Sequence, residues 1–174
     1  MPFIITCQWT VAMFRGNFVQ QQKQVKKTVA IIGATEESGA AIVNKFTGSS
    51  YRLLLVEDEI NQLSQIARSI KRNHLHAEVE IVDCAKEGCW EADIIILAIP
   101  FRELKEIAEK INEVVTQKIV VIISDEKESS LSFNQAQELQ QLLPYSKIVT
   151  ALYNPCSPES FIINDKENLK QFQN

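Results

Sequence analysis

Side chains suited to binding a metal ion are scarce in this sequence. It has only two histidines, His74 and His76, and its four cysteines are irregularly spaced. Structural zinc sites use paired Cys-x-x-Cys motifs or clusters of cysteine and histidine. The separation of Cys84 and Cys89 does not match a Cys-x-x-Cys redox pair either. We therefore predict no metal site, and we expect the cysteines to be buried, reduced thiols of a cytoplasmic protein.

A basic surface and a long hydrophobic run are also missing. The formal net charge is −4 and the pI is about 5.3, whereas a nucleic-acid-binding domain usually carries a basic face. No apolar run approaches the roughly 20 residues that span a bilayer. The apolar start of the chain has no preceding basic residues and no small-residue cleavage site, so it does not resemble a signal peptide. We expect neither nucleic acid nor a membrane as a partner.

The composition is typical of a single globular domain with flanking segments. Hydrophobic residues make up 45% and charged residues 23% of the 174 residues, a balance that supports a sizeable core. Residues 1–26 do not share the pattern that follows, and they contain a polar run of glutamines and lysines. We expect this segment to be a poorly ordered extension, with an edge strand or a partner-binding arm as alternatives. Residues 157–174 form a tail with a possible helix at Lys166–Phe172.

Short apolar runs alternate with segments of helical periodicity from residue 27 onward. The predicted strands are Thr28–Ile32, Tyr51–Val56, Glu78–Val82, Asp93–Ile99, Lys118–Ile123 and Lys147–Leu152. The predicted helices are Ser38–Phe46, Asp58–Lys71, Glu87–Ala92, Leu104–Val115 and Asn134–Leu143. Such alternation produces right-handed crossovers and a parallel sheet. The sequence therefore predicts an α/β fold, a doubly wound Rossmann-type sheet of about six strands in a single domain over residues 27–156, with strand order 3-2-1-4-5-6.

The first predicted strand leads into a turn that carries two glycines. The strand ends at Gly33, and Gly39 follows six residues later at the start of a helix. Strand, glycine-bearing turn and helix open a dinucleotide-binding unit, in which backbone N–H groups and the helix N-terminus face a pyrophosphate. The predicted cofactor-binding residues of this turn are Gly33, Ala34, Thr35, Glu36, Ser38 and Gly39.

Other site residues follow from where ligands bind in this fold, outside the carboxyl ends of the strands. The residues predicted there are Glu57, Ala98, Ile99, Pro100, Ser124 and Asn154. An acid in the place of Glu57 accepts hydrogen bonds from an adenosine ribose and repels the 2′-phosphate of NADP, which favours NAD. The same position also suits an acid that caps the following helix, where Asp58 is a good N-cap. Both interpretations of Glu57 remain open.

Four segments resemble one family: VAIIGATEESG, EADIIILAIP, KIVVIIS and SKIVTALYNP. They resemble the NADP oxidoreductases dependent on the deazaflavin coenzyme F-420 and the cofactor domain of prephenate dehydrogenase, within the wider 6-phosphogluconate-dehydrogenase-like class. The resemblance covers about residues 27–156. It implies NAD or NADP as the cofactor, a small-molecule substrate, hydride transfer in a pocket lined by Ser124 and Asn154, and a possible homodimer.

The turn departs from the Gly-Gly-Thr-Gly-x-x-Gly pattern of those families. Gly33, Thr35 and Gly39 match, whereas Ala34 and Glu36 replace the second and third glycines. At ~5 Å and an effective dielectric constant of ~20, one carboxylate opposite the pyrophosphate costs about 3 kcal/mol. The glycine-rich loop is therefore degenerate, and Glu36 counts against cofactor binding.

Two hypotheses follow for function. One is an NAD(P)-linked oxidoreductase whose cofactors carry the chemistry, since Asn154 stands where prephenate dehydrogenases have a catalytic histidine and cannot act as a general base. No catalytic residue is identified. The other is a non-catalytic Rossmann scaffold that binds a partner protein or another small ligand. The scaffold hypothesis also rests on a difference in length. The reductases that this chain resembles continue past the last strand, whereas this sequence ends at Asn174.

Overall fold

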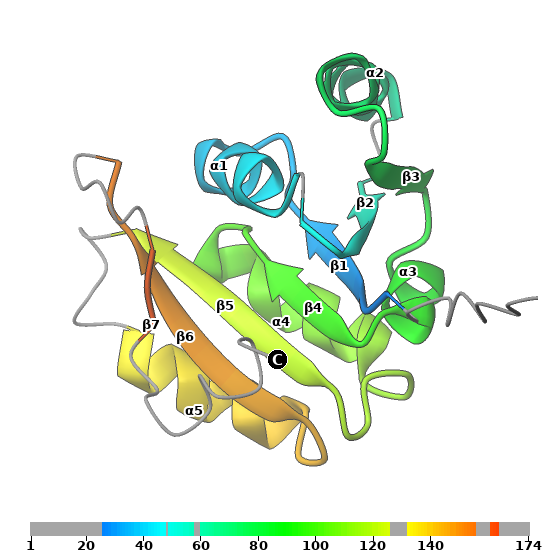
Figure 1. Cartoon of the computed structure of the whole chain (residues 1–174). Coiled ribbons are helices and arrows are strands. Elements are labelled where there is room, and N and C mark those ends of the chain that lie inside the picture. Colours follow the sequence, from blue (N-terminus) through cyan, green and yellow to red (C-terminus); the bar gives the residue numbers. More distant parts are fainter. Residues whose placement is uncertain (1–25, 48, 58–59, 126–131, 156–160, 164–174) are drawn as a thin grey trace, which may run out of the picture.

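The computed structural model describes residues 26–47, 49–57, 60–125, 132–155 and 161–163 (Figure 1). In these ranges one sheet contains seven strands in the order β3-β2-β1-β4-β5-β6-β7. The strands are β1 Thr28–Ile32, β2 Arg52–Val56, β3 Glu78–Val82, β4 Ile94–Leu97, β5 Ile119–Asp125, β6 Lys147–Tyr153 and β7 Phe161–Ile163. The helices are α1 Glu37–Phe46, α2 Ile60–Asn73, α3 Ala85–Glu91, α4 Phe101–Ile111 and α5 Ser132–Leu142.

The first six strands are parallel and confirm the predicted Rossmann-type order 3-2-1-4-5-6. The seventh strand was not predicted. β7 pairs antiparallel with β6, with Phe161 opposite Tyr153, and its three residues are too short a run to give a periodic signal. The N-terminal extension up to residue 25, the Asp58 cap and the possible helix at Lys166–Phe172 lie outside the described residues.

Several predicted boundaries differ from the structure near the carboxyl ends of the strands, and three of them lie next to predicted site residues. β4 stops at Leu97 rather than Ile99. Pro100 caps α4 with extended backbone angles, so this helix begins at Phe101, three residues earlier than predicted. β5 continues to Asp125, because pairing with β6 extends through Ser124↔Leu152 and Asp125↔Tyr153. Ser124 therefore lies within a strand rather than in a loop.

The sheet is covered on both faces, and the strand residues alternate between two hydrophobic clusters. Val29 and Ile31 of β1 pack in the cluster that includes residues of α1 and α2. Ala30 and Ile32 pack in the other cluster, with residues of α3, α4 and α5. Figure 1 shows α1 and α2 on the side of the sheet opposite α4 and α5. This alternation follows from the two-residue period of a strand. It explains why β4 is apolar throughout, and why β1 and β2 are apolar after their first residue.

A close approach between α1 and β1 fixes the start of the first helix. A Cβ atom added to Gly39 would lie 1.9 Å from the carbonyl oxygen of Gly33 and 3.0 Å from the Cα of Ala34. Neither atom can move without displacing the backbone of the turn. Only glycine therefore allows the helix to begin directly over the end of the strand.

Hydrogen bonds and ion pairs connect the strands at the opposite edge of the sheet, where the amino ends of the strands lie. The Thr28 N–H donates to Oδ2 of Asp93 (2.8 Å), and the Asp93 N–H donates to the Thr28 carbonyl (2.9 Å). Arg52, the first residue of β2, pairs with Glu80 at 2.6 Å and Glu91 at 2.9 Å. The hydrogen bond to Glu80 is the main cause that raises the pKa of Arg52, and it lowers the pKa of Glu80. The charge of Arg52 is thus paired with the carboxylates of Glu80 and Glu91 at this edge.

The two described cysteines differ in environment. Cys89 is buried in α3, and desolvation raises the pKa of its thiol to about 12. Lys118 holds the end of this helix, since its ammonium group donates to the carbonyls of Cys89 and Trp90. Cys84 is exposed, so the expectation of buried thiols was wrong there; Cys7 and Cys156 lie outside the described residues.

Replacing Gly39 by alanine is expected to destabilise the fold by about 2 kcal/mol or more, because the new methyl group forces α1 away from β1. Chemical denaturation monitored by circular dichroism measures the loss. Gly88→Ala is the matched control, since its added Cβ meets a side-chain methyl of Val56 at 2.7 Å rather than backbone. We expect a smaller cost for Gly88→Ala. Equal stability of Gly39→Ala and the wild type would contradict the proposed contact.

Iodoacetamide is expected to modify Cys84 in the native protein and to spare Cys89. With a pKa near 12, only about one Cys89 thiol in ten thousand is ionised at pH 8, and the thiolate is the reactive form. Peptide mass spectrometry of alkylated samples measures both sites. In denaturant both should react, whereas rapid native labelling of Cys89 would show that α3 opens readily.

Candidate functional site

Three chain segments leave the sheet side by side at its carboxyl edge. Ile32 of β1 is in register with Val56 of β2 and with Leu97 of β4. The residues that follow are Glu57, Gly33 and Ala98. Since β2 and β4 lead to opposite sides of β1 in the sheet, this edge is the switch point at which ligands bind in open α/β folds.

Gly33 makes the turn after β1 possible. Its φ is +85°, and an added Cβ would lie 2.3 Å from the carbonyl oxygen of Ala98 and 2.8 Å from Cγ2 of Ile99. The Ala98 N–H in turn donates to the Ile32 carbonyl (2.9 Å). The chain after β1 therefore crosses in contact with the end of β4, which requires glycine both for conformation and for space.

The N-terminus of α1 follows directly from this turn. Glu36 is its N-cap residue, and the Glu36 side chain makes no capping hydrogen bond. The Glu36 N–H donates to the Gly33 carbonyl at 3.2 Å. The first N–H groups of a helix have no acceptor within the helix. Together with the helix dipole, these uncapped donors favour an anionic group at the start of α1.

The two non-glycine residues of the turn adopt ordinary conformations. Ala34 is fully buried, and its side chain belongs to the hydrophobic cluster with Ile31 and Ile42. Glu36 has φ −67° and ψ 157°, which any L-residue adopts, and its side chain is exposed. The backbone at these two positions therefore does not need glycine, and the charge of Glu36 is screened by solvent.

Glu57 and Thr35 form a contact that neither interpretation of Glu57, ribose binding or helix capping, predicted. Oε1 of Glu57 accepts hydrogen bonds from the Thr35 N–H (2.9 Å) and from the Thr35 hydroxyl (2.7 Å). Both residues are partly buried. Through these hydrogen bonds, the carboxylate at the end of β2 stabilises the turn that follows β1. No pattern in the sequence predicts this pair, since it depends on the conformation of the turn.

A cavity of about 420 Å³ lies at this edge. Its lining residues are Ile32, Gly33, Thr35, Glu36, Val56, Glu57, Gln62, Ala85, Ile99, Glu103 and Ile107. Five predicted site residues are among them: Gly33, Thr35, Glu36, Glu57 and Ile99. The volume is within the range of small-molecule sites.

The remaining predicted residues do not line this cavity. Ala34 and Ala98 are buried in the core cluster that includes residues of α1 and α2, while Ser38 and Gly39 lie in the first turn of α1 and Pro100 caps α4. Ser124 is buried within β5, and Asn154 follows β6. In the sheet order both lie beyond β4 from the cavity, so they belong to a different part of the carboxyl edge.

Helix residues of the cavity were missed by sequence reasoning. Gln62 lies in the first turn of α2, Ala85 begins α3, and Glu103 lies in the first turn of α4 with Ile107 one turn later. A signal was available, because the helix after each strand of a parallel sheet begins at the carboxyl edge. The helix starts therefore belong in any such prediction.

Among the residues that the structure describes, the lining is acidic and carries no lysine or arginine. Its charged side chains are Glu36, Glu57 and Glu103. Arg102 is 82% exposed in its side chain and pairs with Glu103 at 3.2 Å. Arg52 begins β2, at the far end of the strand from Glu57. The described lining consequently has a negative potential, which the N-terminus of α1 offsets and which Arg102 reduces at Glu103.

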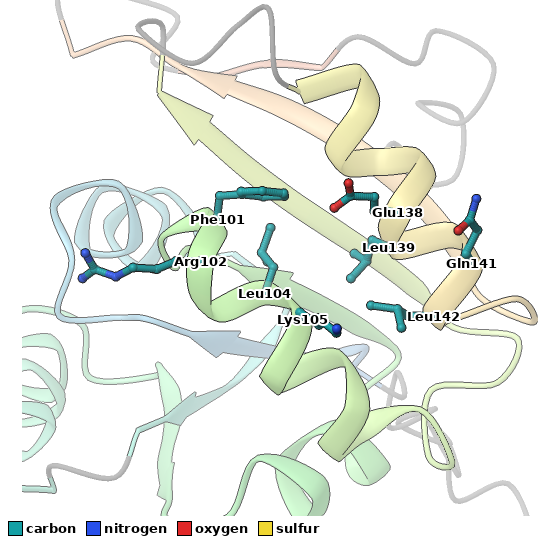
Figure 2. Close-up of a pocket in the computed structure, with 8 residues that line it drawn as sticks. All are labelled: Phe101, Arg102, Leu104, Lys105, Glu138, Leu139, Gln141 and Leu142. Atoms are coloured by element: carbon teal, nitrogen blue, oxygen red, sulfur yellow. The ribbon is translucent and has the colours of Figure 1, made fainter.

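A larger cavity of about 510 Å³ lies between α4 and α5 (Figure 2). Figure 2 shows Phe101 and Glu138 on facing sides of it, above Leu104 and Leu139. None of the predicted site residues lines it. The smaller cavity, which brings together residues from the ends of β1, β2 and β4, is therefore the candidate site.

The described part of the chain holds no group of three or more histidine, cysteine, aspartate or glutamate side chains arranged to hold a metal ion. It also has no helix that is long and apolar enough to cross a membrane.

Comparison with known proteins places the chain among oxidoreductases. An F420-dependent NADP reductase of Methanocaldococcus jannaschii is 26% identical over 160 residues, which cover 80% of this chain and 67% of that protein. A glycerol-3-phosphate dehydrogenase [NAD(P)+] of Macrococcus caseolyticus is 26% identical over 117 residues, covering 64% of this chain but 35% of that protein. The chain thus spans between a third and two thirds of the length of these relatives.

Solved structures agree in fold. A pyrroline-5-carboxylate reductase from Coxiella burnetii gives a TM-score of 0.62 at 16% identity, over 84% of this chain and 54% of that one. An imine reductase variant from Myxococcus stipitatus, in complex with NAD+, gives 0.59 at 18% identity, over 74% and 41%. The family described as NADP oxidoreductase coenzyme F420-dependent matches residues 28–125, more than half of the chain. This protein therefore belongs to that family, whose members have an NAD(P)-binding Rossmann domain.

Proposed function

We propose that this chain binds NAD at the carboxyl edge of its sheet and orients it for hydride transfer with a flavin-like or other small-molecule acceptor. The observation that carries the proposal is the meeting of the Gly33 turn, the uncapped start of α1 and the Glu57 carboxylate around one cavity. These are the three elements that hold the pyrophosphate and the ribose in dinucleotide-binding Rossmann domains.

The residues around the cavity fit the adenosine half of the cofactor. The N-terminus of α1 would hold the pyrophosphate, since its donors are not capped by the Glu36 side chain. The apolar side chains of Val56, Ala85 and Ile107 line the cavity and suit the faces of an adenine ring. Glu57 would accept a hydrogen bond from a ribose hydroxyl.

The nicotinamide half would extend across the end of β4. Ala98–Pro100 follow that strand, and Ser124 and Asn154 lie at the neighbouring ends of β5 and β6. When bound, the nicotinamide ring supplies the hydride chemistry. The protein's part is to orient the ring, because asparagine is not a general base. The F420-dependent NADP reductase among the relatives supports a deazaflavin as the partner in this exchange.

The charge of the cavity supports NAD rather than NADP. A 2′-phosphate at the ribose would lie close to Glu57, and the lining residues that the structure describes include no lysine or arginine to compensate. Arg52, the arginine nearest in sequence, is held in ion pairs with Glu80 and Glu91 at the amino edge. The extra phosphate of NADP would therefore meet repulsion without a counter-charge.

A second candidate function, that of a scaffold that binds a different ligand, has one observation in its favour. Three carboxylates line the cavity, from Glu36, Glu57 and Glu103, and such a lining suits an uncharged or cationic ligand better than a pyrophosphate. In this alternative the fold is retained without the cofactor.

Titration of the protein with NADH and with NADPH, followed by cofactor fluorescence, separates the two candidates. We expect saturable NADH binding and an affinity for NADPH that is at least about tenfold weaker, because one uncompensated like-charge contact costs more than 1.4 kcal/mol. Absence of binding by either cofactor at millimolar concentration would exclude the oxidoreductase proposal and favour the scaffold.

Removing the charge of Glu36 is expected to strengthen NADH binding about fivefold in Glu36→Gln. The gain is modest because the side chain is exposed, and exposed charge interactions contribute about 1 kcal/mol or less. Glu36→Gly is expected to gain at least as much, since glycine is accepted as an N-cap. The control is Glu109→Gln, which removes an exposed charge on α4 away from the cavity lining. A Glu36→Gln variant that binds like the wild type would show that this carboxylate does not face the pyrophosphate.

A further inference from the structure

We propose that Thr35 is the positioning residue for Glu57, and that this pair, rather than Glu57 alone, determines the choice between NAD and NADP. The inference rests on the proposed cofactor site and extends it to a residue of the turn. It starts from the two hydrogen bonds through which Thr35 holds the carboxylate at the end of β2.

Both hydrogen bonds end on the same oxygen. The Thr35 N–H and the Thr35 hydroxyl donate to Oε1 of Glu57 at 2.9 and 2.7 Å. Oε2 accepts no hydrogen bond from the described part of the chain, and Glu57 lines the cavity. Oε2 is therefore the oxygen left for a ribose hydroxyl. Two hydrogen bonds to a charged group fix its rotamer before the ligand arrives, which lowers the entropic cost of binding.

The same two donors explain the exclusion of a 2′-phosphate. A backbone N–H and a hydroxyl that converge on one oxygen form a small anion-binding arrangement, and in this protein the carboxylate of Glu57 occupies it. A phosphate group at this edge meets a fixed negative charge and finds both donors already used. Without the carboxylate, the donors of Thr35 become available to a phosphate oxygen.

Thr35 is therefore expected to have opposite effects on the choice between NAD and NADP in the presence and in the absence of Glu57. With Glu57 present, it strengthens the preference for NAD by holding the carboxylate in place. With Glu57 replaced by serine, it assists NADP by donating to the 2′-phosphate. A residue that only stabilised the turn would affect both cofactors equally in both backgrounds, so the sign change identifies the positioning role.

The test compares NADH and NADPH affinities in five proteins: wild type, Thr35→Val, Thr35→Ser, Glu57→Ser and the Thr35→Val/Glu57→Ser double variant. Valine keeps the branched shape of threonine without the hydroxyl, and serine keeps the hydroxyl. We expect Thr35→Val to reduce the NADH-over-NADPH preference about tenfold, and Thr35→Ser to keep it. Glu57→Ser should favour NADPH, and the double variant should lose most of that gain.

A ligand-free measurement accompanies the titrations. The amide resonance of Thr35 in a ¹⁵N–¹H spectrum should lie downfield in the wild type and shift upfield in Glu57→Gln, since its acceptor loses its charge. A Thr35 amide that is insensitive to Glu57→Gln would overturn the inference by showing that the pair does not form in solution.

The outcomes separate the inference from the proposed function. If the wild type prefers NADH but Thr35→Val leaves the preference unchanged, the positioning role of Thr35 is overturned and the cofactor site stands. If the wild type binds neither cofactor, the proposed function falls, and the selectivity role of Thr35 falls with it. Circular dichroism of each variant shows whether it is folded, and the Thr35→Ser result identifies the hydroxyl as the group responsible.

Discussion

The contact between the start of α1 and the end of β1 is the constraint on which the rest of the site depends. At Gly39 the helix approaches the Gly33 carbonyl so closely that a methyl group would lie 1.9 Å from the oxygen. This approach directs the first turn of α1 toward the carboxyl edge, where its N–H groups point away from the strand. The positive φ of Gly33 then brings the turn against the end of β4. A bulkier turn would hold the helix farther from the edge, and the cavity would lose its source of positive potential.

Electrostatics divides the molecule into two edges. At the amino edge, Arg52 is paired with two carboxylates and Asp93 accepts a hydrogen bond from β1. At the carboxyl edge, the described cavity lining has three carboxylates, and the N–H and hydroxyl of Thr35 both donate to one of them, Glu57. Selectivity at such a site comes from repulsion of the wrong ligand as much as from attraction of the right one. In the proposed NAD site, the acidic lining would repel the additional phosphate of NADP, at a cost in affinity for the pyrophosphate.

The sequence predicted the architecture well, because the information was local and repeated. Buried parallel strands appear as continuous β-branched runs such as Ile94–Leu97, and the helices between them have clear apolar faces. The order of the strands followed from the two half-units of a doubly wound Rossmann domain, once the alternation had indicated that fold. Predictions were weaker where tertiary pairing overrides the local pattern. β5 runs through Ser124 because β6 supplies partners there, and β7 exists as a strand because it finds an edge of the sheet to pair with.

What the sequence alone determined is the fold, and with it the carboxyl edge at which open α/β sheets bind their ligands, since glycine positions and hydrophobic periodicity report backbone conformation directly. Only the tertiary structure decided which side chains meet there. Ala34 faces the core and Glu36 is exposed, so two substitutions that look alike in the motif have different consequences. The Glu57 carboxylate contacts Thr35, a residue 22 positions away. Hydrogen bonds of this kind depend on distances of a few tenths of an ångström between segments brought together by the sheet, and a linear pattern carries no record of them.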